Sequence, residues 1–290
     1  MRARTTRTTR VAVAGACVAV CATLLSSCAG ASGAATGTMR EDERPQVVVG
    51  AARLDAAHED VLMPLGAFQL QPAEYALLRR ASDDLVQQCV ARAGFPLVFP
   101  ARSSTEELSV THFSFGVWTE GRAAAYGYGL VPRTAGETAF ETDLAGGDRA
   151  RLAAVQDCNA QPEASELNDG RESNGVASNA DSESWLQMES DPRSVTIIEA
   201  HRSCMAGHDV QVADDWSVEG FESMTVEQRI ATALLDVGCK RESNFVQGLA
   251  DIAAAYQQHF IERHATELNE ERTQLASLLA RAEQIVGELG

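Results

Sequence analysis

The sequence predicts a mainly α-helical fold in which two related halves are each stapled by a disulfide bond and a long helix forms the C-terminus. Three observations predict it. Apolar residues recur at three- and four-residue steps through several segments, four cysteines lie in or beside these segments, and no proline follows Pro192.

The N-terminus predicts export and lipidation. Several arginines precede an apolar run from Val11 to Leu25, which is typical of a secretory signal and shorter than the roughly 20 residues that a membrane-spanning helix needs. The quartet LSSC at residues 25–28 resembles the lipobox of bacterial lipoproteins, in which the cysteine is lipidated and the chain is cut before it. We therefore expect residues 1–27 to be a lipoprotein signal peptide and Cys28 to anchor the protein at the outer face of the cell membrane. Ordinary cleavage a few residues later, which would release the protein, is the alternative.

Charge excludes nucleic acid as a partner. The chain has 24 basic and 41 acidic residues, and loss of the four arginines in residues 1–27 changes its net charge from −17 to −21. A chain this acidic repels the phosphate backbone, so no DNA or RNA binding is expected.

A stalk and a first helical half follow the anchor. Residues 28–60 begin with small and polar residues and are predicted to be a lipidated stalk. The first half covers residues 61–160, with a helix over 72–93 that starts at a proline and stops at a glycine. An aromatic-rich loop region and a short helix that carries Cys158 complete it. Residues 161–189 are polar and acidic, which predicts a linker.

The second half, residues 190–290, repeats this order and adds the long helix. A helix that carries Cys204 is followed by an irregular stretch and a helix that carries Cys239. Apolar residues then recur through charged neighbours from about 243 to 287, a length of nearly 70 Å if helical. Because His264 and other polar residues interrupt the apolar stripe, we expect this helix to pack within the chain rather than on a partner helix.

Four cysteines remain after the signal peptide and the anchor are set aside. In an exported chain an even number predicts two disulfide bonds, and four cysteines allow three pairings. The repeat favours Cys89 with Cys158 and Cys204 with Cys239. A four-cysteine metal site is the alternative, but the chain has no C-x₂-C spacing.

Several motifs resemble those of a group of exported actinobacterial lipoproteins without an assigned activity. The motifs are SDPRSVTIIEAHRSCM from residue 190, LLDVGCKRESNFV from residue 234 and the charged C-terminal helix; MPLGAF, YGYGL and the helix around Cys89 resemble the N-terminal half of that group. The turn AGHDV after Met205 departs from the glycine-aromatic turn of the group. The resemblance implies export and a helix–cysteine build, and it implies no reaction.

The motifs of common catalytic sites are missing. Ser114 lacks the first glycine of a nucleophile elbow, and His259 and His264 diverge on a helix. His201, Cys204 and His208 approach metal-ligand spacing, but we expect Cys204 to be used in a disulfide. The sequence also has no phosphate-binding glycine loop. Because all of these motifs are missing, we predict no catalytic residue, no metal ligand and no cofactor.

Acidic residues beside a tryptophan are the basis of the enzymatic alternative. Asp214, Asp215, Glu219 and Glu222 cluster around Trp216, as they would in a glycosidase that stacks and cleaves a sugar. This cluster would make the protein a cell-wall-directed hydrolase.

An aromatic band provides the leading functional hypothesis. Seven of the 16 aromatic residues lie between residues 95 and 128, and Trp118, Tyr126 and Tyr128 are the candidate ligand-binding members. Aromatic faces stack on sugar rings, although such a band also builds cores. We therefore expect a non-catalytic binding or accessory protein for a cell-wall component, such as a glycan, or for a membrane protein partner.

Overall fold

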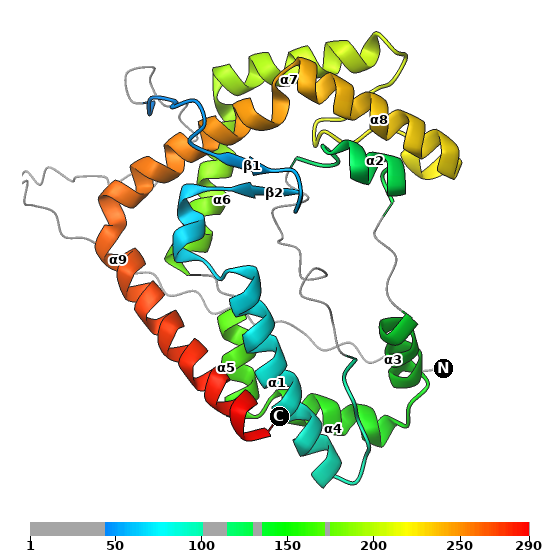
Figure 1. Ribbon diagram of the computed structural model, residues 1–290, viewed down its shortest axis with the longest axis vertical. Helices are drawn as coiled ribbons and strands as arrows, with labels where there is room; N and C mark the ends of the chain where they lie inside the picture. Colours follow the sequence, from blue (N-terminus) through cyan, green and yellow to red (C-terminus); the bar gives the residue numbers. More distant parts are fainter. Residues whose placement is uncertain (1–43, 101–114, 130–134, 172–174, 290) are drawn as a thin grey trace, which may run out of the picture. The chain divides into compact units, whose positions relative to one another are not determined.

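Helices dominate the described chain, which confirms the predicted fold class. The computed structural model describes residues 44–100, 115–129, 135–171 and 175–289, so the signal segment and Cys28 lie outside it. The helices are α1 (Pro72–Arg92), α2 (Glu120–Tyr126), α3 (Ala135–Ala145), α4 (Arg149–Asn159), α5 (Pro162–Arg171), α6 (Val176–Ser190), α7 (Pro192–Ala206), α8 (Val226–Glu242) and α9 (Phe245–Leu289) (Figure 1). The same ranges hold an antiparallel hairpin of β1 (Arg53–Asp55) and β2 (Asp60–Leu62) and the 3-10 helices η2 (Pro64–Phe68) and η4 (Phe221–Ser223).

Helix α1 begins and ends where the sequence predicts a helix. Pro72 takes the first helical position, and Gln71 and Glu74 form a reciprocal capping box that satisfies free backbone N–H groups. Gly94 follows the helix with φ +90°, a left-handed conformation that glycine adopts without strain. The buried side of α1 packs against α4, α5 and α9 through Leu78, Ala81, Val86 and Val90.

Both predicted disulfide bonds are present. Cys89 of α1 is bonded to Cys158 of α4, with Cα atoms 5.8 Å apart. Cys204 of α7 is bonded to Cys239 of α8, with Cα atoms 5.6 Å apart. Each bond joins the end of one helix to a later helix, which is the arrangement that the repeat predicts.

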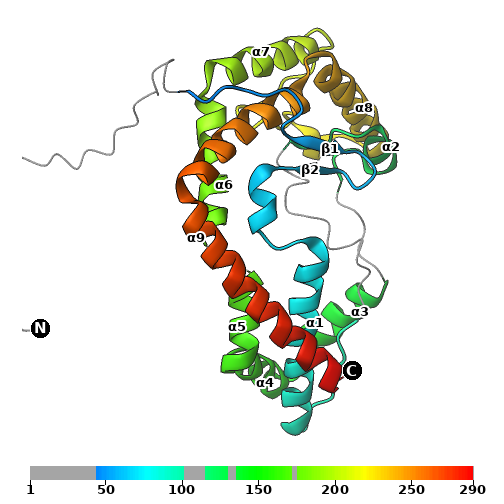
Figure 2. The same cartoon turned by 60° about the vertical axis from the view of Figure 1, so that its left-hand side comes forward.

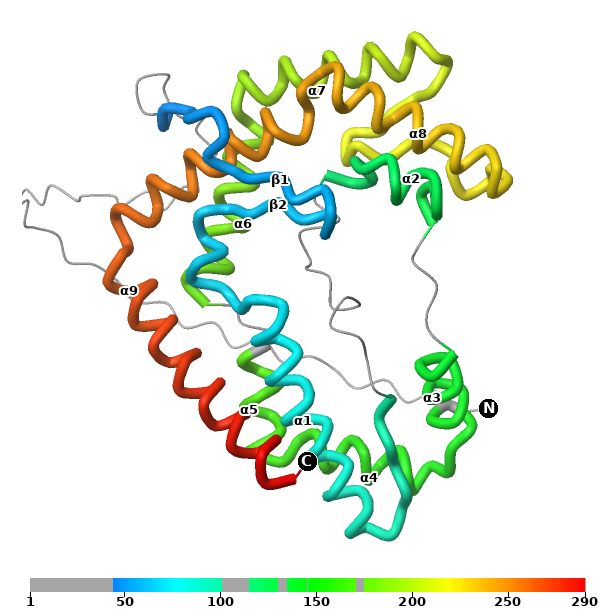
Figure 3. Tube along the Cα trace, viewed as in Figure 1, coloured from blue at the N-terminus to red at the C-terminus, as the bar shows by residue number. Residues whose placement is uncertain are grey.

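The C-terminal helix packs within the chain, as expected. Helix α9 lies beside α1, α6 and α7 (Figures 1 and 2). At His264 the backbone has φ −124° and ψ 25°, and the helix bends (Figure 3). Leu268 beyond the bend packs with η2 and α6, whereas Ala282 packs with α1 and α5. One long helix thus contributes to both halves, and the described residues group into a single compact unit.

Residues 162–171 and 176–189 are helical, so the prediction of a linker over residues 161–189 is wrong. They form α5 and most of α6, which pack on α1 and α9 respectively. The buried side chains are mostly small, which is why the composition concealed them: Ala164, Leu167, Ala177, Ala180, Ser184 and Met188. Gly170 illustrates the close approach that small residues permit, because a Cβ atom there would lie 2.2 Å from a methyl carbon of Leu278.

The predicted stalk over residues 28–60 ends too late, because its last residues are folded. Ala52 is buried and residues 53–55 form β1. Asp251 of α9 accepts hydrogen bonds from the backbone N–H groups of Gly50 (2.9 Å) and Ala52 (3.0 Å). Gln247 donates to the carbonyl oxygen of Ala52 at 2.9 Å. No local pattern could reveal these contacts, since the carboxylate lies 199 and 201 residues further along the chain.

Replacing Asp251 by alanine is expected to lower the free energy of unfolding by about 2–3 kcal/mol, because a charge-assisted acceptor is lost and a buried N–H group is left unpaired. Urea unfolding measures this loss, and hydrogen exchange at Gly50 and Ala52 shows whether the N-terminal segment detaches. Asp251→Asn keeps one acceptor oxygen and should lose less. Unchanged protection of both amides in the alanine variant would contradict the prediction.

Candidate functional site

A surface pocket lies where α6, α7 and the loop after α7 meet. Its cavity volume is about 260 Å³, slightly below the range of about 300–1,000 Å³ that is common for small-molecule sites. An aromatic ring, two aliphatic side chains, a guanidinium group and three carboxylates line it: Trp216, Val195, Ile198, Arg202, Glu189, Glu199 and Asp214. The members from α7 are spaced by three or four residues and therefore share one face of that helix.

Trp216 is held at the pocket by other aromatic rings. Its centroid lies 5.3 Å from that of buried Phe245, with the rings at 89°, and 5.9 Å from that of Trp185. The backbone of Trp216 has φ +65°, which is strained for a bulky residue and persists only where the surroundings fix it. A short bridge between Val212 and Val218 closes the loop on either side. The half-buried indole is thus a rigid part of the pocket.

Arg202 connects the loop to α7. Its guanidinium donates to the carbonyl oxygen of Ala213 at 3.1 Å and to Asp214 at 3.0 Å. The Nε atom is buried and has no hydrogen-bond partner among the residues that the structure describes. The pocket is therefore lined by one positive and three negative side chains, and the guanidinium keeps one donor without a hydrogen bond.

The four acids expected to form a hydrolytic centre are not brought together. Only Asp214 lines the pocket, and its side chain is fully exposed and paired with Arg202. Asp215 instead accepts hydrogen bonds from the hydroxyl and backbone N–H of Ser217, which hold its pKa below the ordinary value. A general acid for glycoside cleavage needs a raised pKa, so Asp215 has the opposite character.

The aromatic residues expected to bind a ligand do not form one surface. Trp118 packs on the apolar cluster at the start of α9, whereas Tyr128 donates its hydroxyl to Asp236 at 3.2 Å. Tyr126 is 38% exposed. Other members of the band pack into different apolar clusters: Phe95 and Phe99 beside Cys158, and Phe115 against Trp185. Phe113 and Ser114 lie outside the described residues.

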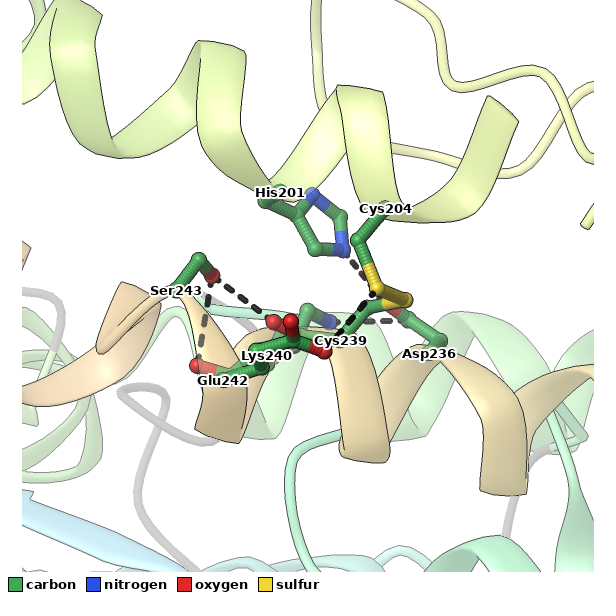
Figure 4. Close-up of a disulfide and its surroundings, with 7 residues drawn as sticks. All are labelled: His201, Cys204, Asp236, Cys239, Lys240, Glu242 and Ser243. Atoms are coloured by element: carbon green, nitrogen blue, oxygen red, sulfur yellow. Dashed lines mark hydrogen bonds and ion pairs between the residues drawn. A yellow bond between two sulfur atoms is a disulfide. The ribbon is translucent and has the colours of Figure 1, made fainter. Parts of the chain in front are cut away.

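A second group of polar residues is buried between α7 and α8, beside the disulfide bond (Figure 4). Asp236 of α8 lies at its centre, 2.7 Å from Nε2 of His201 and 2.9 Å from Nζ of Lys240. Lys240 also donates to the carbonyl oxygen of Val117 at 2.8 Å. These three side chains are at most 4% exposed. The cluster therefore joins α7, α8 and the segment before α2 without contacting solvent.

The charges of this cluster shift its pKa values. Burial opposes ionisation of Asp236, but the hydrogen bond from His201 and the charge of Lys240 outweigh it and keep the pKa of Asp236 below its ordinary value. Burial lowers the pKa of Lys240, and Asp236 counteracts this effect. Burial and then the charge of Asp236 raise the pKa of Tyr128. The arrangement stabilises an ion pair rather than preparing a group to react with substrate.

Comparisons with known proteins return no relative. No protein-family model, curated protein or solved structure matches the chain. Among the residues that the structure describes, none of the helices combines the length and apolarity needed to cross a bilayer.

The sequence provided only part of the pocket. It singled out Asp214 and Trp216 but missed Arg202 and the carboxylates that α6 and α7 contribute. The buried cluster was missed as well, although one signal could have revealed it. Lys240, the only lysine of the chain, lies four residues after Asp236 in a segment rich in apolar residues. Such a pair on the inner face of a helix predicts a buried ion pair.

Proposed function

We propose that the protein is a lipid-anchored component of the outer face of the cell membrane that binds a cell-wall glycan at the Trp216 pocket without cleaving it. The membrane attachment rests on the signal-like N-terminus and on Cys28. The proposal for binding rests on the half-buried indole of Trp216, which lies in a pocket lined by charged hydrogen-bonding groups. A flat aromatic face accepts the apolar face of a sugar ring, while carboxylates and a guanidinium bind its hydroxyl groups.

Binding without cleavage is supported by the use of the acids near the pocket. Asp214 is paired with Arg202, and Asp215 is bound to Ser217. Hydrolysis by these acids, the alternative function, would require a protonated carboxyl group beside the sugar. Asp215, whose pKa is lowered, does not suit that role.

A membrane protein partner is the second candidate because apolar side chains are exposed near the pocket. Leu186 of α6 is 66% exposed and lies one turn before Glu189, and Val195 at the pocket is 42% exposed. Single exposed apolar residues are common on protein surfaces, but these two lie at or near the pocket and enlarge its apolar surface.

Replacing Trp216 by alanine is expected to weaken binding to isolated cell-wall sacculi by about tenfold or more, because an aromatic contact and its buried area are lost. The full chain, purified in detergent with oxidised disulfides, is sedimented with sacculi at low salt and at salt that screens surface charge. Tyr126→Ala is the matched control, since it removes an aromatic ring that does not line the pocket and should bind like the wild type.

Because Trp216 also packs on Phe245, Asp214→Asn provides an independent test at a fully exposed side chain. We expect it to weaken binding without changing the melting temperature. Full binding by both pocket variants, or loss on Tyr126→Ala, would overturn this site. Absence of sedimentation by the wild type would overturn glycan binding and favour the protein partner.

A further inference from the structure

The disulfide between α7 and α8 lies beside a histidine. Cys204 is near the end of α7, and His208 follows it by four residues, just past the helix end at Ala206. The sulfur atoms of Cys204 and Cys239 and a ring nitrogen of His208 all lie within 4.8 Å of one another. Glu242, one turn after Cys239 on α8, places a carboxylate oxygen 3.8 Å from the sulfur of Cys204 (Figure 4).

The two cysteines are held together by more than their covalent bond. One turn before each cysteine, His201 and Asp236 bridge α7 and α8 at 2.7 Å. Buried Met205 and Val218 pack with Cys239 in the same region. Reduction would therefore leave two thiols facing each other between helices that are already fixed.

We propose that reduction of the Cys204–Cys239 disulfide creates a Zn²⁺ site formed by both cysteines, His208 and Glu242. A dithiol reductant supplies two electrons and two protons, becomes a disulfide itself, and leaves two thiols on the protein. Binding of the metal ion then displaces both thiol protons to solvent. The disulfide form masks the site.

The donor set determines the class of metal ion. Two thiolates, an imidazole and a carboxylate are ligands that Zn²⁺ takes in tetrahedral geometry, at about 2.3 Å from sulfur and 2.0–2.2 Å from nitrogen or oxygen. Thiolates disfavour Mg²⁺ and Ca²⁺, which prefer oxygen ligands. Cys204 is half-buried while His208 and Glu242 are exposed, so a reductant and the ion can both approach from solvent.

The other disulfide provides an internal comparison. Among the described residues, the grouping of ligand atoms found at Cys204 and Cys239 does not recur at Cys89 and Cys158. Both pairs would be reduced together, so a difference in metal binding between them would report the contribution of His208 and Glu242.

The proposal predicts that the reduced chain binds one Co²⁺ ion, a spectroscopic substitute for Zn²⁺, with thiolate charge-transfer absorption that Zn²⁺ abolishes. The full chain is reduced with a phosphine without oxygen and titrated, with circular dichroism recorded alongside. His208→Ala should weaken binding more than the roughly 10–100-fold typical of losing a group outside the ligand shell. His58→Ala removes another exposed histidine and should bind as the wild type does.

Three results with the wild type and His208→Ala would overturn the proposal, and a fourth comes from the variant that lacks this cysteine pair. One is reduced wild type without thiolate absorption, and another is equal affinity in His208→Ala. The third is loss of helical signal on reduction, because the site requires α7 and α8 to remain folded. Cys204→Ser/Cys239→Ser retains the other cysteine pair and should show no thiolate absorption; retained absorption would assign the metal to Cys89 and Cys158 instead.

Discussion

Replacing Asp236 by alanine is expected to lower the free energy of unfolding by about 3–5 kcal/mol, the usual cost of breaking a buried ion pair. The carboxylate accepts from His201, Lys240 and Tyr128, and its removal leaves a buried ammonium group with only the carbonyl oxygen of Val117. Urea unfolding followed by circular dichroism measures the loss. Asp214→Ala removes a paired but fully exposed carboxylate and should change stability by less than about 1 kcal/mol. Similar losses in the two variants would contradict the role of the buried cluster.

The pH dependence of stability should change in the same variant. The pKa of Asp236 is lower in the folded chain than in the unfolded chain, where it is about 3.9. A lowered pKa contributes stability that is fully present above the unfolded value and is lost as pH falls through the folded value. The wild type should therefore lose stability below about pH 4, and Asp236→Ala should lose less over this range.

Replacing Phe245 by alanine is expected to lower the free energy of unfolding by about 3–5 kcal/mol and to weaken ligand binding at the pocket. Phe245 is fully buried at the start of α9, and its ring contacts both Trp216 of the pocket and His201 of the buried cluster. A cavity at this position removes the edge-to-face contact that holds the indole. The ligand-binding effect depends on the proposed function, whereas the stability effect does not.

Thermal and urea unfolding measure the stability of Phe245→Ala, and sedimentation with sacculi measures its binding. Leu186→Ala removes a large apolar side chain that is 66% exposed and should change stability by no more than about 0.5 kcal/mol. A fully stable Phe245→Ala variant would show that the aromatic cluster is not required for packing.

Local patterns in the sequence predict the strongest elements well. Proline, glycine and capping residues mark the ends of α1, and the apolar stripe predicts α9, although it does not predict the bend at His264. The cysteine repeat predicts both disulfide pairings because each cysteine sits near the end of a helix. These features depend on neighbours within a few turns, so the order of residues is sufficient to reveal them.

Features that depend on distant contacts could not be predicted in this way. Residues 161–189 were interpreted as a linker because most of the side chains that their helices bury are alanine or serine, with Leu167 and Met188 as the large exceptions. The pocket combines α6, α7 and a loop, and Arg202 becomes part of it only when the loop folds back on α7. The aromatic band was misinterpreted as one ligand-binding surface for a related reason. Its rings are neighbours in the sequence, but they pack into different apolar clusters, as Trp118 and Tyr128 do.

The contact between Asp251 and the amides of Gly50 and Ala52 joins the start of the described chain to its last helix. When the chain is delivered N-terminus first, β1 and α1 emerge long before α9. Asp251 of α9 binds the turn that precedes β1, and α1 packs directly on α9. Closing a loop of about 200 residues is slow because contacts distant in sequence form late. Docking of the N-terminal segment on α9 should therefore come late, so that a chain stopped before residue 251 can pack α1 on α4 and α5 but cannot fix the turn at Gly50 and Ala52.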